Sequence, residues 1–308
     1  MVPTPDRPAR YRGRLAPSPT GAMHLGLART ALVAWLRARS ADGALVLRVE
    51  DIDAPRVVQG SAESIIEDLS WLGLDWDEGP HLQSERLQLY AAAIQQLRAA
   101  GLVYPCTCSR KDIAGLASAP HGDLGASYPG TCRNGPTRSD RPAALRLRVD
   151  AAAPSFRDGV HGLYPASEVD DFVLQRGDGV YAYQLVVVVD DIEMQISEVT
   201  RGDDLLTSTP RQLALYRALG ATPPAFFHVP LVLSLDGRRM SKREKALGIA
   251  QLRAAGVTAE RVLGFLAHSL GFATDGEQLS ARELLARWDP ERLPRTAAKL
   301  DPTVLLRG

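Results

Sequence analysis

The sequence predicts an α/β fold in which helices cover an open parallel sheet, with a small inserted unit and a helical C-terminal part. A strand pattern, a helix pattern and a second strand pattern follow one another near the N-terminus, and this order builds a parallel β-α-β unit. Residues 185–189 are all apolar, which is typical of a central strand covered on both faces. After Lys242 the spacing of apolar residues is helical.

The first part of the chain gives the clearest strand and helix patterns. In its first helix the side chains of Leu25, Ala28 and Leu32 recur on one face, and Ser84 is a plausible N-cap for a later helix. The expected elements are strands at 11–16 and 45–49 and helices at 25–39, 61–72 and 84–100.

The composition changes between Tyr104 and about Asp150, where Gly, Pro, Ser and Arg dominate and all three cysteines lie. This change indicates a small inserted domain. Further strands are expected at 181–189, 195–200 and 226–233, and helices at 249–255, 259–270 and 281–286, with no strand after Lys242. The predicted division is 1–100 and 184–245 for the two halves of the sheet domain, 101–183 for the insertion and 246–308 for the helical part.

The composition is that of an ordinary globular protein, with 308 residues of which 45% are hydrophobic and 23% charged. The formal net charge is zero, so a nucleic-acid partner would have to use local basic patches. Two arginine-rich stretches, within 133–148 and 282–299, could bind phosphate or could be solvated surfaces. No apolar run is long enough for a bilayer and no signal peptide is evident, so we expect a cytoplasmic protein without a membrane partner. We also expect a monomer.

Polar side chains follow directly after the expected strands. In an open parallel sheet, ligands bind at the carboxyl ends of the strands, where the strand order switches. Any one of these polar positions could simply be the start of a surface loop. Because polar residues follow four expected strands, the sequence predicts a shared cleft. The residues concerned are Ser18 and Thr20, Glu50 and Asp51, Asp190 and Asp191, and Arg201 and Asp203.

Two segments are candidates for binding phosphate. His24 and Gly26 stand at the start of the first helix, where amide groups and a partial positive charge suit an anion. Gly26 permits close approach of a nucleotide, and His24 could donate to a phosphate oxygen as charge builds on it. Lys242 lies in a basic run that could close on departing pyrophosphate, although such a run is more often solvated surface.

The segments Arg14–Gly26 and Arg239–Arg243 resemble the HIGH and KMSKS signatures of class I aminoacyl-tRNA synthetases, the first being similar to the glutamyl type over many consecutive residues. The resemblance implies a Rossmann-like parallel-sheet catalytic domain with a zinc-containing insertion domain and a small C-terminal helical domain. Leu27 and Arg239 depart from the family pattern. The implied ligands of ATP, taken with Mg²⁺, are His24, Gly26, Arg239, Met240, Ser241 and Lys242, of which His24, Gly26 and Lys242 are catalytic.

An amino-acid pocket is expected in the same cleft. Arg14 can hold a carboxylate with two hydrogen bonds, and Glu50 can receive an ammonium group. Two arginines suit a substrate with two carboxylates, while a structural ion pair between Arg14 and Glu50 is the alternative. The resemblance implies that glutamate is held by Arg14, Ala16, Ser18, Glu50, Tyr183 and Arg201.

A metal site is predicted from the three cysteines, Cys106, Cys108 and Cys132, unless they are unrelated. Three thiolates and one further donor make a closed tetrahedral zinc site, which is structural. On spacing alone the fourth ligand could be His121, whereas the resemblance implies Tyr128.

The resemblance further implies a short relative of the glutamyl-tRNA synthetases, since the sequence stops at Gly308, where an anticodon-binding region would follow. It implies a ligase that forms glutamyl-adenylate and transfers the glutamyl group to queuosine in the anticodon of tRNA(Asp). Three alternatives stay open: a truncated synthetase that charges the 3′ end of tRNA(Glu), a non-catalytic zinc-containing RNA-binding paralogue, and a small-molecule nucleotidylyltransferase.

Overall fold

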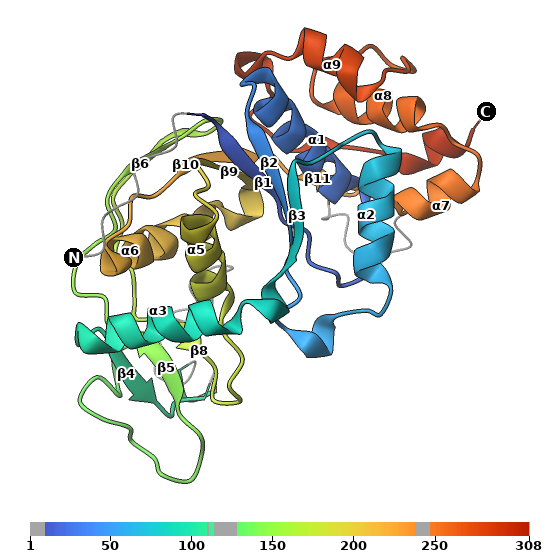
Figure 1. The fold of residues 1–308 in the computed structure, drawn as a ribbon. Coiled ribbons are helices and arrows are strands. Elements are labelled where there is room, and N and C mark those ends of the chain that lie inside the picture. Colours follow the sequence, from blue (N-terminus) through green and yellow to red (C-terminus); the bar gives the residue numbers. More distant parts are fainter. Residues whose placement is uncertain (1–9, 110, 114–127, 238–246, 308) are drawn as a thin grey trace.

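The computed structural model describes residues 10–109, 111–113, 128–237 and 247–307 (Figure 1). Its helices are α1 (Leu25–Ser40), α2 (Ser61–Trp71), α3 (Leu87–Ala99), α5 (Tyr183–Glu193), α6 (Thr209–Leu219), α7 (Ile249–Ala254), α8 (Ala259–Ser269) and α9 (Ala281–Arg287). Its strands are β1 (Arg12–Leu15), β2 (Ala44–Val49), β3 (Glu78–Leu82), β4 (Val103–Cys106), β5 (Ala144–Leu147), β6 (Phe156–Asp158), β7 (Gly162–Tyr164), β8 (Val173–Gln175), β9 (Glu198–Gly202), β10 (Ala225–Val229), β11 (Val232–Leu233) and β12 (Ala298–Lys299).

Two sheets meet edge to edge in the centre of the molecule. One has the parallel order β1-β2-β3, and the other has the order β7-β6-β10-β9, parallel except for β7. Where β1 adjoins β9, the Ser197 amide donates to the Arg12 carbonyl at 2.9 Å and Arg14 Nη1 donates to the Thr200 carbonyl at 2.6 Å. As β1 runs from Arg12 to Arg14, its partner on the other strand moves from Ser197 to Thr200, so β1 and β9 run in the same direction. The strand order therefore reverses at β1 and β9, where an α/β sheet binds its ligands.

Helix α1 connects this sheet to the C-terminal helices. Its buried side chains join β1 and β2 on one side and α8 and α9 on the other in one apolar cluster. Figure 1 shows α1 between the parallel strands and the helices coloured orange and red. The start of α1, which carries the predicted phosphate site, is thus held on both sides by buried apolar contacts.

The prediction of a central strand at residues 181–189 was wrong, because the chain from Tyr183 onward forms helix α5. A fully apolar run fits a buried helix as well as a buried strand, and its valines favour the strand only weakly. Here α5 is covered by α3 and α6 within a second apolar cluster, so every face of the run is buried. Asp190 and Asp191 consequently lie inside a helix and do not follow a strand.

Other differences have local causes. Pro230 cannot donate to a ladder, and the run predicted as one strand at 226–233 is divided there into β10 and β11. A short strand, β12, pairs with β11 in the tail, where no strand was predicted. Helix α3 begins at Leu87, and Ser84 is bound to the Asp51 carboxylate instead of capping the helix. The helices predicted at 25–39, 61–72, 249–255, 259–270 and 281–286 are confirmed to within a few residues.

A third, antiparallel sheet lies in the cysteine-containing part of the chain. It has the order β4-β5-β8 and is drawn below α3 in Figure 1. The same part of the sequence also supplies β6, which pairs with β10 beside the central strands. None of the described helices is both long and apolar enough to cross a membrane.

Candidate active site

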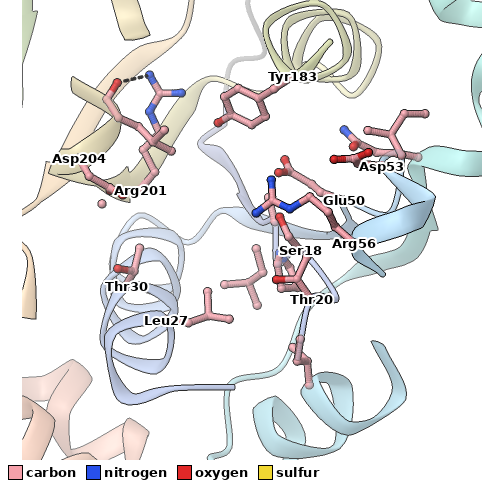
Figure 2. A pocket seen from close by; sticks show the side chains of 18 of the residues that line it. Ser18, Thr20, Leu27, Thr30, Glu50, Asp53, Arg56, Tyr183, Arg201 and Asp204 are labelled. Atoms are coloured by element: carbon pink, nitrogen blue, oxygen red, sulfur yellow. Dashed lines mark hydrogen bonds between the residues drawn. The ribbon is translucent and has the colours of Figure 1, made fainter. Parts of the chain in front are cut away.

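A cleft of about 1230 Å³ opens beyond the carboxyl ends of β1, β2 and β9 (Figure 2). It brings together side chains from both halves of the sequence. Among the polar residues expected after the strands, the lining residues are Ser18, Thr20, Glu50 and Arg201, whereas Asp51, Asp190, Asp191 and Asp203 do not line the cleft. Arg239, Met240, Ser241 and Lys242 lie outside the described residues. The predicted site residues that line the cleft are Arg14, Ala16, Ser18, His24, Gly26, Glu50, Tyr183 and Arg201.

His24 is the N-cap of α1. Its Nδ1 accepts a hydrogen bond from the Leu27 amide at 3.1 Å, so the proton of the neutral ring is on Nε2. A side chain at Gly26 would bring its Cβ to 3.1 Å from this ring, which explains why glycine suits the position. The helix start therefore presents amide groups, a positive dipole end and an imidazole donor to the cleft.

Arg14 lies on β1 and Glu50 directly follows the neighbouring strand β2, but the two do not pair with each other among the described contacts. Arg14 is buried, with Nε 3.7 Å from Asp191, and Glu50 accepts from Arg48 Nη2 at 3.2 Å. Burial lowers the pKa of Arg14 and raises the pKa of Glu50. Each side chain thus has its own direct partner, and the charge of Arg14 acts on Glu50 without an ion pair between them.

A buried ionic network lies under the cleft, and its centre is Arg48. This fully buried guanidinium lies 2.7 Å from Asp191, 3.2 Å from Glu50 and 3.8 Å from Asp190. The three carboxylates keep the pKa of Arg48 above its usual value despite burial. Asp190 in turn accepts hydrogen bonds from Gln83, Arg86 and Tyr90. The sequence analysis gave Arg48 no role, although a single arginine within an apolar strand signals a buried, paired charge.

Arg201 faces the cleft from β9 and has a different environment. Its guanidinium donates to His228 Nε2 at 3.0 Å, Gln212 Oε1 at 2.8 Å and Thr209 Oγ1 at 2.9 Å, all of them uncharged acceptors. Among the described residues no carboxylate forms an ion pair with it, although only 5% of Arg201 is exposed. A buried cation without a counter-ion is unfavourable unless a ligand supplies the negative charge.

The labelled side chains in Figure 2 show how this charge faces the pocket. Arg201 lies on one side of the space and Glu50 on the other, with the Tyr183 ring directed into it from α5. Burial raises the pKa of Tyr183, so its hydroxyl stays protonated and can donate or accept. Opposite charges on facing walls suit a substrate that carries both an ammonium and carboxylate groups.

His228 and Asp158 extend the Arg201 environment and were not singled out by the sequence analysis. His228 Nδ1 lies 2.6 Å from Asp158 Oδ2, and both side chains are fully buried. Burial lowers the pKa of His228 to about 4, so the ring is neutral near pH 7. The only local signal is a histidine within the apolar run Phe226–Val229, which is as typical of a satisfied core residue.

This histidine predicts a pH dependence of stability. Its folded pKa, about 4, lies below the usual histidine value of 6.5, so between these values the unfolded chain binds more protons. Stability is therefore present above about pH 6.5 and falls as the pH drops towards 4, by on the order of 1 to 3 kcal/mol. Urea unfolding of the wild type and of His228→Gln at pH values between 7 and about 4 measures this loss of stability. A loss of equal size in both proteins would contradict the assignment.

The three cysteine sulfur atoms converge beside β4. They lie within 4.8 Å of one another, and Cys108 Sγ is 3.6 Å from Cys132 Sγ. Zinc–sulfur bonds of about 2.3 Å in a tetrahedron require sulfur atoms about 3.8 Å apart, so the spacing fits zinc. The Tyr128 hydroxyl lies 3.4 Å from Cys106 Sγ and accepts from the Cys132 amide at 2.8 Å, while His121 lies outside the described residues.

The family was identified by comparison with known proteins. The matching family model describes the catalytic domain of tRNA synthetases class I (E and Q), over residues 10–306. The chain therefore belongs to the class I tRNA synthetases of this type. Within them it groups with proteins named Glutamyl-Q tRNA(Asp) synthetase.

The relatives cover most of the chain. The protein of that name from Nitratidesulfovibrio vulgaris is 51% identical, over 86% of this chain and 87% of its own length. The protein of the same name from Deinococcus radiodurans is 52% identical, over 90% of this chain and 95% of its own length. The crystal structure of glutamate-tRNA synthetase from Elizabethkingia anophelis superposes with a TM-score of 0.80 at 26% identity, over 96% of this chain and 69% of that one.

Proposed function

We propose that this protein activates L-glutamate with ATP and transfers the glutamyl group to queuosine at position 34 of tRNA(Asp). The observation that carries the first step is Arg201, a buried cation that faces the cleft and whose hydrogen-bond partners among the described residues are all neutral. A substrate carboxylate would supply the missing negative charge.

Each polar wall of the cleft receives one part of glutamate in this proposal. The side-chain carboxylate binds Arg201 and the hydroxyl of Tyr183, and Arg14 adds a second positive charge beside the substrate. The ammonium group faces Glu50, whose carboxylate is kept in place by Arg48. Ser18 and the backbone at Ala16 border the same space.

Activation joins the two substrates at the start of α1. An oxygen of the glutamate α-carboxylate attacks the α-phosphorus of ATP, the bond to the β-phosphate oxygen breaks, and pyrophosphate leaves. His24 Nε2–H and the amides beside Gly26 stabilise the charge that grows on the phosphate oxygens. We assign the pyrophosphate side to Lys242, with Arg239, Met240 and Ser241, by resemblance; Mg²⁺ would offset charge on ATP when bound.

The acceptor is inferred from the relatives, which share about half of their residues with this chain and are named for glutamyl-Q and tRNA(Asp). A queuosine hydroxyl would attack the carbonyl carbon of glutamyl-adenylate and release AMP. Labelled glutamate is offered to tRNA from cells that make queuosine and from cells that cannot. Labelling of tRNA(Asp) in the first pool alone supports the proposal.

Other outcomes of this test separate the alternatives. Equal labelling of tRNA(Glu) in both pools would make the protein a short glutamyl-tRNA synthetase. Glutamate activation without labelling of either RNA would point to a different acceptor. An absence of glutamate-dependent exchange between ATP and pyrophosphate would refute the activation step itself.

We also propose that residues 101–183 form an insertion with one structural zinc, held by Cys106, Cys108, Cys132 and Tyr128. The converging sulfur atoms and the adjacent Tyr128 hydroxyl support this donor set. A closed set of four protein ligands would stabilise the region and leave no open position for catalysis.

Metal analysis tests the zinc proposal. About one zinc per chain is expected in the wild type, and Cys132→Ser should abolish stoichiometric binding. Tyr128→Phe should weaken zinc affinity by at least about tenfold, because it removes one ligand and keeps the ring. His121→Ala serves as the matched control and should bind zinc like the wild type. Loss of zinc in that control instead of in Tyr128→Phe would reassign the fourth ligand.

A further inference from the structure

The orientation of Arg201 depends on an acceptor from the neighbouring strand. In the parallel register of β9 and β10, Arg201 lies opposite His228, and its Nε donates to His228 Nε2 at 3.0 Å. The other two nitrogens of the guanidinium bond Gln212 and Thr209. The Nη2 atom also lies 3.4 Å from the Leu205 carbonyl, and the Nε bond to His228 fixes the plane of the group together with these bonds.

The hydrogen-bond pattern determines which nitrogen of His228 carries the proton. Arginine Nε is always a donor, so His228 Nε2 must accept and the single ring proton must lie on Nδ1. Nδ1 then donates to Asp158 Oδ2 at 2.6 Å. Only the neutral ring with this tautomer satisfies both partners, since a protonated ring would present a second donor to Arg201.

Asp158 is itself held firmly. Its Oδ1 accepts from the amides of Val160 and His161 at 2.9 Å, and its Oδ2 lies 3.2 Å from the His228 amide. These bonds tie the turn after β6 to β10 and keep the carboxylate aimed at the ring. Three strands, β6, β10 and β9, thus form one chain of contacts from Asp158 through His228 to Arg201.

We propose that Asp158 and His228 act as a positioning pair that orients the Arg201 guanidinium and thereby sets the affinity for the side-chain carboxylate of the substrate. This inference rests on the proposed function, in which Arg201 binds glutamate. His228 is a positioning residue, because it acts on the substrate only through Arg201.

The choice of histidine has an electrostatic reason. A carboxylate in direct contact with Arg201 would orient it equally well but would neutralise its charge and compete with the substrate. The neutral imidazole supplies the acceptor without the charge, while the charged Asp158 is kept one ring farther away. The arrangement orients Arg201 and leaves its positive charge available to glutamate.

The test compares two substitutions at His228. His228→Leu has similar bulk and no acceptor, whereas the amide of His228→Gln can accept from Arg201 and donate to Asp158. Exchange between ATP and pyrophosphate gives KM for glutamate and for ATP separately. His228→Leu should raise KM for glutamate about 10- to 100-fold, with KM for ATP changed less than threefold. His228→Gln should restore KM for glutamate to within about fivefold of the wild type.

Controls make each outcome decisive. His268→Leu, an exposed histidine on α8, should leave both KM values unchanged. If His228→Leu does not fold, His228→Asn replaces it, since its shorter amide cannot reach both partners. An unchanged KM for glutamate, equal rises in both KM values, or failure of His228→Gln to restore binding would each overturn the pair while leaving the proposed function intact. A wild type that shows no glutamate-dependent exchange would overturn both.

Discussion

Arg201→Gln is expected to lower kcat/KM for glutamate by about 100- to 1,000-fold, with KM for ATP changed less than threefold. The substitution keeps a polar side chain but removes the positive charge that the substrate carboxylate would meet in a buried site, a loss of about 3 to 4 kcal/mol. Exchange between ATP and pyrophosphate at varied glutamate concentration measures this effect.

The same substitution should not destabilise the protein without substrate. Arg201 has no carboxylate partner among the described residues, so its charge is a cost until glutamate binds. We expect the melting temperature of Arg201→Gln to equal or exceed that of the wild type, and glutamate to stabilise only the wild type.

A substitution of an arginine outside the cleft shows whether the effect depends on losing the charge at this site or on losing any positive charge. Arg217 is exposed on α6, where it donates to the carbonyls of Ala151 and Ala152, and Arg217→Gln should behave like the wild type. A tenfold or smaller change in Arg201→Gln would show that Arg201 is not the main anchor of the substrate. The carboxylate would then have to be bound elsewhere in the cleft.

Several residues that line this candidate site could be named from the sequence because their signals are local. His24 and Gly26 lie where a strand pattern changes into a helix pattern, and Glu50 directly follows a run of apolar residues. Such positions can be assigned from a few neighbouring residues. The common edge of a parallel sheet then brings them together without any knowledge of side-chain contacts.

The supporting contacts could not be predicted in this way, because their partners are distant in sequence. His228 and Asp158 are separated by 70 positions and Arg48 and Asp191 by 143. No periodicity links such pairs. The error over residues 181–189 had the same origin, since the elements that bury this run, among them α3 and α6, cannot be recognised from its own residues. That helix is what brings Asp191 beside Arg48 and Arg14.

Arg48→Met should lower the free energy of unfolding by about 3 to 5 kcal/mol near neutral pH. Methionine matches the length of the arginine stem, so the loss reports the charge more than the volume. Without the guanidinium, the carboxylates of Glu50, Asp190 and Asp191 remain buried close together, and their repulsion and desolvation are no longer offset. Urea unfolding measures the change through the midpoint of the transition.

Arg12→Met is the matched control on the adjoining strand β1. Arg12 makes a two-bond pair with the half-exposed Glu78 and donates from Nε to the Met194 carbonyl, so its loss should cost about 1 to 2 kcal/mol, less than the loss of Arg48. The two variants remove the same group from neighbouring strands, so their difference isolates the effect of burial. Equal losses of unfolding free energy in the two variants would mean that the buried contacts of Arg48 stabilise the protein no more than the contacts of Arg12 do. A larger loss in Arg48→Met, accompanied by a rise in KM for glutamate, would show that the network under the cleft holds Glu50 and Arg14 in their binding positions.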